Sequence, residues 1–251
     1  MSVNSVLLLI FILLLWKIGG SKGKLTLAAL GFNLLFMFVM LILINWGFPV
    51  FPLTLITSIL ITGMNLFFIN GYHLKTQFAF ISSLLVLSMM VLLIFMTVRL
   101  MHLEGIPNEE LMEMDMYSLN IGLSFTSLSV SVMVMSVIGA INDITISITS
   151  AIYELNQNVP TLSKQKLVQS GLVIGKDVLG STMNTLIFAL VGGQLALFIW
   201  VSDLHYSITQ LFNTKILVIE WANLLISGIA ISLAIPITTF LMVYRLKRDI
   251  S

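Results

Sequence analysis

Long uninterrupted runs of apolar residues constrain this chain more than any other feature of its sequence. A helix needs about 20 apolar residues to cross the roughly 30 Å hydrocarbon layer of a membrane, and several such runs are present. Their length exceeds the roughly 10 residues of a membrane β-strand and their apolar residues do not alternate, so they predict helices. Because 58% of the residues are hydrophobic and only 9% are charged, we expect an all-α, polytopic transmembrane helix bundle.

Seven spans are expected, with the amino terminus outside the cell and the carboxyl terminus in the cytoplasm. We place them near residues 3–18, 25–46, 53–70, 78–98, 118–138, 175–200 and 216–244 of a single integral membrane domain, residues 1–251. Short cytoplasmic loops collect Lys and Arg. This topology leaves only Arg99 and Lys215 outside. The basic residues on the cytoplasmic side are Lys17, Lys22, Lys24, Lys75, Lys164, Lys166, Lys176, Arg245, Lys247 and Arg248.

Composition and motifs exclude several other classes of protein. The chain has no cysteine, which rules out disulfides, cysteine-bound iron–sulfur clusters and thiol nucleophiles. No basic patch interleaved with aromatic residues is present, so we expect no nucleic-acid partner. The zinc-protease, serine-hydrolase and phosphate-loop motifs are missing as well. We therefore expect neither an enzyme nor a bound cofactor or metal.

A different pattern appears between the fifth and sixth spans, where residues 140–174 form a cytoplasmic connector. Its first part is expected to be an amphipathic helix, because polar residues and isoleucines recur on opposite faces. Such a helix either lies along the membrane surface or turns back partway into the protein. The polar face holds Asp143, Ser147, Ser150 and Glu154, and the apolar face holds Ile141, Ile144, Ile148 and Ile152.

The sixth span begins with the polar stretch GKDVLGSTMNT, residues 175–185. Asp177, Ser181 and Asn184 are separated by four and three residues, so they share one helical face. Asn184 lies well inside the expected span, where polar groups usually face a protein interior or a water pathway. Three glycines of the same segment are expected to allow close helix packing, as small residues do in membranes: Gly171, Gly175 and Gly180.

Oxygen-bearing side chains of the connector and the sixth span are expected at the same cytoplasmic end of the bundle. Carboxylate, amide and hydroxyl oxygens suit hard cations or proton transfer better than copper or zinc. The alternative is that these groups only pack helices or stay solvated at the membrane surface. Glu220 is set apart, because Trp221 beside it is typical of the outer interface. The candidate pathway or coupling residues are Asn142, Asp143, Asp177, Ser181 and Asn184.

These two polar segments resemble the YibE/F-like family of bacterial multi-pass membrane proteins. The first block of the resemblance is Gly139, Ala140, Asp143, Ser147, Ile148, Ser150 and Glu154, and the second is Gly175, Lys176, Asp177, Gly180, Asn184, Thr185 and Leu186. The resemblance is closest over residues 118–200. It implies a multi-pass protein of the bacterial plasma membrane, in a short form without the extra soluble region of longer family members.

Two functions are compatible with these residues and this resemblance. The first is a permease or channel-like subunit for an ion or small solute, without its own ATPase. The alternative is a non-transporting membrane scaffold, or partner subunit, that holds a longer family member through the cytoplasmic region 160–176. Besides the lipid bilayer, the expected partners are a second copy of the chain or a longer family member.

Overall fold

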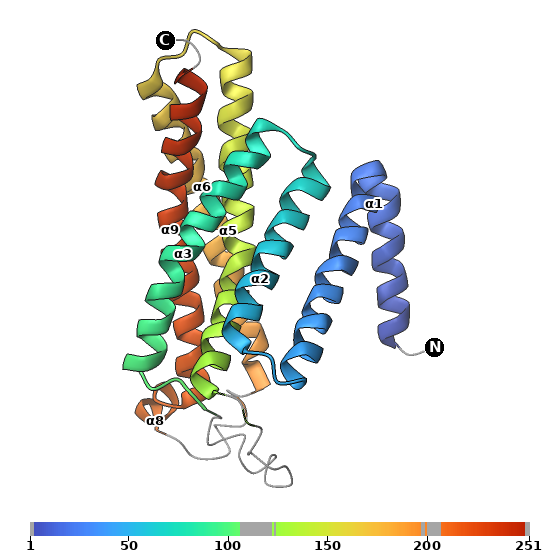
Figure 1. The fold of residues 1–251 in the computed structure, drawn as a ribbon, viewed down its shortest axis with the longest axis vertical. Coiled ribbons are helices and arrows are strands. Elements are labelled where there is room, and N and C mark those ends of the chain that lie inside the picture. Colours follow the sequence, from blue (N-terminus) through green and yellow to red (C-terminus); the bar gives the residue numbers. More distant parts are fainter. Residues whose placement is uncertain (1–2, 106–121, 123, 197–198, 200–206, 249–251) are drawn as a thin grey trace.

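Long helices make up the fold. The computed structural model describes residues 3–105, 122, 124–196, 199 and 207–248, and no strand occurs within these ranges, which confirms the all-α expectation for them. The start of the predicted fifth span and the end of the predicted sixth span lie outside the described residues. The helices in Figure 1 are α1 (Val3–Asn45), α2 (Val50–Gly63), the π-helix η1 (Met64–Phe68), α3 (Leu74–Leu100), α5 (Phe125–Asn158), α6 (Lys164–Gly193), α8 (Ile208–Phe212) and α9 (Lys215–Arg248).

Several of these helices are long and apolar enough to cross a membrane. In the described part of the chain there are six such segments: Val3–Gly20, Lys22–Asn45, Val50–Phe68, Leu74–Leu100, Phe125–Asn158 and Lys215–Lys247. The chain is therefore a multi-pass membrane protein. The helix that carries the predicted sixth span, α6, is not one of the six, because polar and charged residues are spread along it.

The first helix doubles back on itself. At Gly20 the backbone dihedrals of α1 (φ 55°, ψ −132°) leave the helical region. Glycine adopts a positive φ readily because it has no Cβ atom. The two arms of α1 run in opposite directions (Figure 1), and Lys24 Nζ lies 5.7 Å from the centre of the Trp16 ring across the turn. The predicted spans 3–18 and 25–46 correspond to these two arms.

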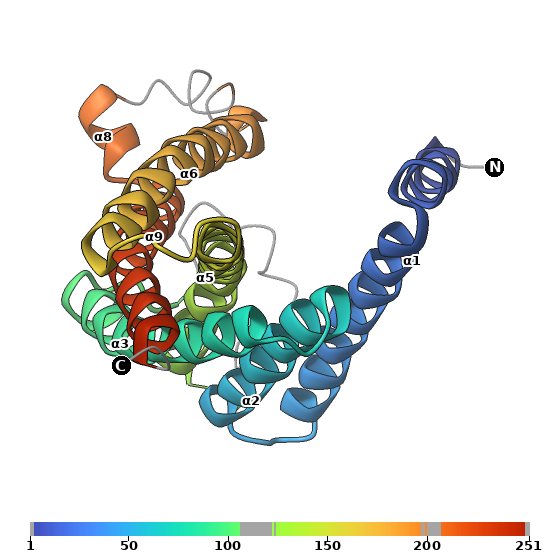
Figure 2. The ribbon, with the colours of Figure 1, turned by 90° about the horizontal axis from the view of Figure 1, so that it is seen from above.

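The helix α5 lies at the centre of the bundle, with α2, α3, α6 and α9 around it (Figure 2). Its most extensive contacts are with α3 and α9. Large apolar side chains fill these contacts and supply the dispersion attraction that holds helices together in lipid. The central part of this cluster consists of Met90 and Ile94 from α3, Val134, Val137, Ile141 and Ile148 from α5, and Ala230 and Ile231 from α9.

Residues 140–174, predicted as a connector, do not form a helix of their own. Residues 140–158 continue α5 without a break, and residues 164–174 are the first part of α6. The physical reason is that Val137, Ile141 and Ile144 keep one buried stripe across the predicted boundary. Only the outward side of α5 changes from apolar to polar there. The helix ends at Asn158, two residues before Pro160, a residue type that interrupts helices.

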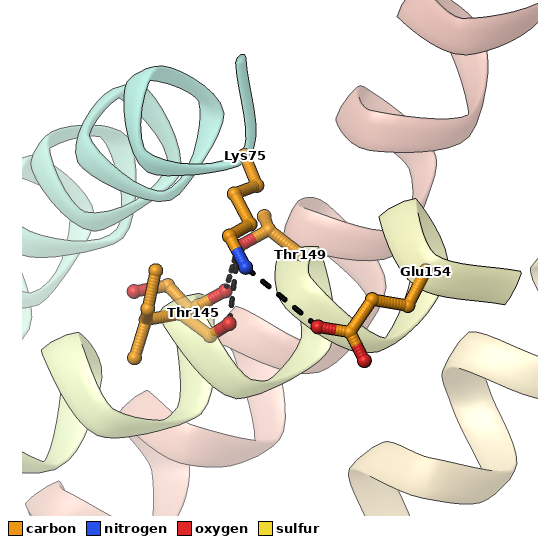
Figure 3. A network of polar contacts seen from close by, with 5 residues as sticks. Lys75, Thr145, Thr149 and Glu154 are labelled. Carbon is orange, nitrogen blue, oxygen red and sulfur yellow. Dashed lines mark hydrogen bonds and ion pairs between the residues drawn. The ribbon is translucent and has the colours of Figure 1, made fainter. Parts of the chain in front are cut away.

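Two contacts join the helices at the end of the bundle that holds the carboxyl terminus. Lys75 at the start of α3 forms an ion pair of 3.7 Å with Glu154 near the end of α5 (Figure 3). Lys247 Nζ donates a hydrogen bond of 3.1 Å to the main-chain oxygen of Pro160. Successive long helices run in alternate directions (Figure 1). The basic residues near Gly20, at the starts of α3 and α6 and at the end of α9 therefore gather at this end.

The helix α6 packs on its neighbours through two buried glycines. A Cβ atom added at Gly175 would overlap Ile235 Cγ2, and one added at Gly171 would lie 2.7 Å from Thr239 Cγ2. Both contacts are with α9, so the missing side chains let the two helices approach closely. Gly180 differs from this pair, because a Cβ atom added there meets no heavy atom within 4 Å. Its predicted role in packing is therefore not fulfilled within the described part of the chain.

Replacing Gly175 by alanine is expected to lower the free energy of unfolding by about 1–3 kcal/mol, because the added methyl group overlaps Ile235. The matched control is Gly180→Ala on the same helix. It is expected to leave stability unchanged or slightly raised, since alanine favours a helix over glycine by about 1 kcal/mol. Thermal unfolding of the purified protein in detergent measures both variants. Equal unfolding midpoints would contradict the packing assignment.

Candidate functional site

The polar residues of α5 divide between two sides of the helix. Asn142 and Thr145 are buried inside the bundle, whereas Asp143 is exposed. Successive residues of a helix point about 100° apart, so sequence neighbours fall on different sides. The structure therefore separates Asn142 from Asp143, although both were predicted to belong to one pathway.

The inner polar side of α5 is tied to the neighbouring helices. Asn142 Nδ2 donates to Thr62 Oγ1 of α2 at 3.4 Å. The hydroxyl oxygens of Thr145 and of Ser83 on α3 are 2.8 Å apart and share a hydrogen bond. Hydrogen bonds between helices stabilise membrane bundles, since the alternative is an unsatisfied polar group in hydrocarbon. Asn142 thus contributes to helix packing in this arrangement.

The outer side of α5 carries an exposed stripe. Ser136, Gly139 and Asp143 follow one another at spacings of three and four residues and are all exposed, and Ser147 continues the stripe in a half-buried position. The Ser147 hydroxyl donates to the main-chain oxygen of Asp143 at 2.6 Å and so does not serve its carboxylate. Within the described residues Asp143 forms no ion pair. Its carboxylate is therefore exposed and has no compensating charge among the described residues.

The helix α6 presents a second polar surface, also directed away from the bundle. Asp177, Ser181 and Asn184 are all exposed and share one side of α6, as their spacing predicts. That side is opposite to the buried Gly171 and Gly175. No ion pair to Asp177 occurs in the part of the chain that the structure describes. We refer to Asp143 with Asp177, Ser181 and Asn184 as the outer polar face.

The two aspartates lie at matching levels of the antiparallel helices α5 and α6. The register follows from Gly171, where an added Cβ atom would lie 2.8 Å from Ile152 Cδ1 of α5. Asp143 is about four turns before the end of α5, and Asp177 is about three and a half turns after the start of α6. Both are thus about 20 Å from the turn between the helices. They were expected at the cytoplasmic end, but α5 and α6 both extend past their predicted boundaries and place them near mid-helix.

Glu154 has a basic partner in the structure, whereas the two aspartates of the outer polar face have none among the described residues. Glu154 is paired with Lys75, and its side chain is 67% exposed (Figure 3). Among the described residues, no three His, Asp or Glu side chains are placed so that they could hold a metal ion. The carboxylates of Asp143 and Asp177 form no ion pair among the described residues, and such carboxylates attract hydrated cations or protons.

The inner contacts made by Thr62, Ser83 and Thr145 could not be predicted from the sequence. A serine or threonine in an apolar helix can bond to a carbonyl of its own preceding turn, as Thr62 does to Ser58 at 2.7 Å. Its presence therefore does not predict a contact with another helix. The useful signal is the helical spacing of Asn142, Thr145 and Thr149 along the otherwise isoleucine-rich side of α5.

These features define a multi-pass helical membrane protein with an exposed polar face on two neighbouring helices. The model of the YibE/F-like protein family matches residues 7–248, and the chain belongs to this family. The match extends well beyond residues 118–200, where the resemblance is closest on the sequence motifs. Comparisons with curated proteins and with solved structures gave no match.

A cysteine introduced at Ser181 is expected to react in native membranes with a charged methanethiosulfonate reagent, because the reaction needs water around the thiolate. The control is Met89→Cys, since Met89 is 49% exposed near the middle of the apolar helix α3. The native chain has no cysteine, so each label reports one position. We expect Ser181→Cys to react at least about tenfold faster than the control. Equally slow labelling of both would indicate a dry outer polar face.

Proposed function

We propose that this chain is the membrane subunit of a permease for an ion or a small hydrophilic solute, which passes along the outer polar face of α5 and α6. The observation that carries the proposal is the exposure of Asp143, Asp177 and Asn184 within long helices. An aspartate at the centre of a membrane helix costs roughly 2.5–3.5 kcal/mol when it faces lipid. A water-filled pathway along this face removes that cost.

A pathway on an open face needs a second wall. Gly139 on α5 and Gly180 on α6 both have open space where a side chain would lie. Small residues beside the polar groups allow another helix to approach closely. We propose that a second copy of this chain, or a longer member of the family, supplies that helix. The sequence carries no phosphate-binding motif, so the proposed permease subunit works without an ATPase of its own.

The proposed orientation places the amino terminus outside and the carboxyl terminus in the cytoplasm of a bacterium, across the plasma membrane. Its support is the concentration of basic residues at the end of the bundle that holds the carboxyl terminus, because cytoplasmic ends of spans are rich in Lys and Arg. Because the basic residues mark the cytoplasmic end, the opposite end of the bundle, which holds the turn between α1 and α2, is the proposed outer end.

Single cysteines on either side of α2 and η1 test this orientation. Phe48 and Tyr72 are 50% and 74% exposed, and they lie at opposite ends of the span that α2 and η1 form together. A membrane-impermeant maleimide added to intact cells is expected to label Phe48→Cys, whereas Tyr72→Cys reacts only after permeabilisation. The reverse pattern would show that the chain is inserted with the opposite orientation.

Flux into sealed vesicles tests the pathway, with protons, Na⁺ and K⁺ as the probes. Asp143→Asn and Asp177→Asn are each expected to lower the flux at least about tenfold, because the carboxylates attract the cation into the membrane. The matched control is Glu154→Gln, which removes an exposed acid from the end of the same α5 helix. Its flux is expected to stay within about twofold of the wild type, since exposed ion pairs contribute little.

Normal flux in both aspartate variants would overturn the pathway. No flux from the wild type, together with stable co-purification of a longer family member, would instead support a non-transporting scaffold. In that case the cytoplasmic region 160–176 is the first segment to test for binding the partner, by replacing its lysines and repeating the co-purification.

A further inference from the structure

A small polar pocket lies between α5, α6 and α9, apart from the aspartates of the outer polar face. Its volume is about 220 Å³. Its polar lining consists of Ser136 from α5 and of Glu220, Asn223 and Ser227 from α9, and the remaining lining is leucine and alanine. The sequence interpretation set Glu220 apart at the outer interface and gave it no role.

The pocket side of α9 is a continuous polar stripe. Glu220, Asn223 and Ser227 are spaced by three and four residues, so they lie on one side of the helix. This side faces the protein, since Ser227 is only 2% exposed. Trp221, in contrast, is 38% exposed. The helix therefore turns the tryptophan outward and the neighbouring carboxylate into the pocket.

The pocket offers hydrogen-bond acceptors and negative charge without a matching cation. Asn223 Oδ1 is buried and has no hydrogen-bond partner among the described residues. No Lys, Arg or His lines the pocket. Glu220 forms no ion pair within the described ranges, and Lys215, at the start of the same helix, donates to the main-chain oxygen of Glu104. A buried acceptor without a partner is unfavourable, so this arrangement is suited to a ligand that is positively charged.

We propose that this pocket binds one monovalent metal cation, for which Na⁺ is the probe. Carboxylate, amide and hydroxyl oxygens are the ligands that hard cations prefer. The single carboxylate of Glu220 balances one positive charge, whereas a divalent ion would leave one positive charge that no residue of the pocket balances. The volume leaves room for the ion with several waters, since each water occupies about 30 Å³.

The inference stands on the pocket and does not require that the outer polar face conducts. The two are nevertheless adjacent. Ser136 and Asp143 are two helical turns apart on the same exposed side of α5. A cation held by Glu220 would therefore lie at one end of the outer polar face, on the side of the bundle away from the carboxyl terminus.

Equilibrium binding of radioactive Na⁺ to the detergent-purified protein tests the site, with N-methylglucamine chloride keeping the ionic strength constant. The wild type is expected to bind one Na⁺ per chain. Glu220→Gln is expected to weaken binding at least about tenfold, because the charge that balances the ion is gone. Ser227→Ala is expected to weaken it by a smaller factor and provides a second variant if Glu220→Gln does not fold. Glu154→Gln, which removes an exposed acid far from the pocket, is the control that is expected to bind as the wild type does.

Absence of Na⁺ binding by the wild type would overturn the proposal, as would unchanged binding in both pocket variants. If Ca²⁺ displaced the bound Na⁺ more strongly than K⁺ did, the claim that the pocket selects a monovalent ion through the single charge of Glu220 would be contradicted. Because the assay needs no vesicle, a negative flux experiment leaves its result unaffected.

Discussion

A polar group in hydrocarbon must find a partner, and this requirement acts on the protein at every level. Backbone N–H and C=O groups meet it by forming helices, which is why the long apolar runs become α-helices. Side chains meet it differently on the two sides of α5. On the inner side, Asn142 and Thr145 share hydrogen bonds with α2 and α3. On the outer side, Asp143 has no ion pair within the described chain. The unpaired carboxylate on that side connects the fold with its proposed function.

The direction of the outer polar face is fixed by packing on its far side. Gly171 and Gly175 bring α6 so close to α9 that α6 cannot rotate about its axis without a steric clash. Asp177 and Asn184 lie opposite these glycines and are therefore held outward. Glycine packing and polar exposure are two consequences of one helix orientation. A sequence can carry both signals on a single helix because the two faces do not share residues.

Sequence patterns predicted what depends on local periodicity and failed where packing decides. The two arms of α1, the helices of the following spans and the shared face of Asp177, Ser181 and Asn184 all follow from spacing. The helix α5 continues without a break across residue 140, because the change from apolar to polar residues affects only its outer side. Sequence spacing also did not indicate that Asn142 is buried while Asp143 is exposed, because burial depends on which helices pack against each side of α5. The pocket at Glu220 combines residues from three helices, a contact that one sequence does not reveal.

The choice between a wet pathway and a dry interface depends on where positive charge is available. A dry interface would bury the carboxylates of Asp143 and Asp177, which requires basic groups at the same level. Of the 12 basic residues in the chain, Lys176 alone lies near the middle of a described helix, and the others lie toward helix ends or at the α1 turn. One Lys176 from a second copy cannot balance both acids, so a homo-oligomeric contact on this face would have to admit water. A dry contact therefore demands a different partner, with at least one more basic residue at mid-membrane depth.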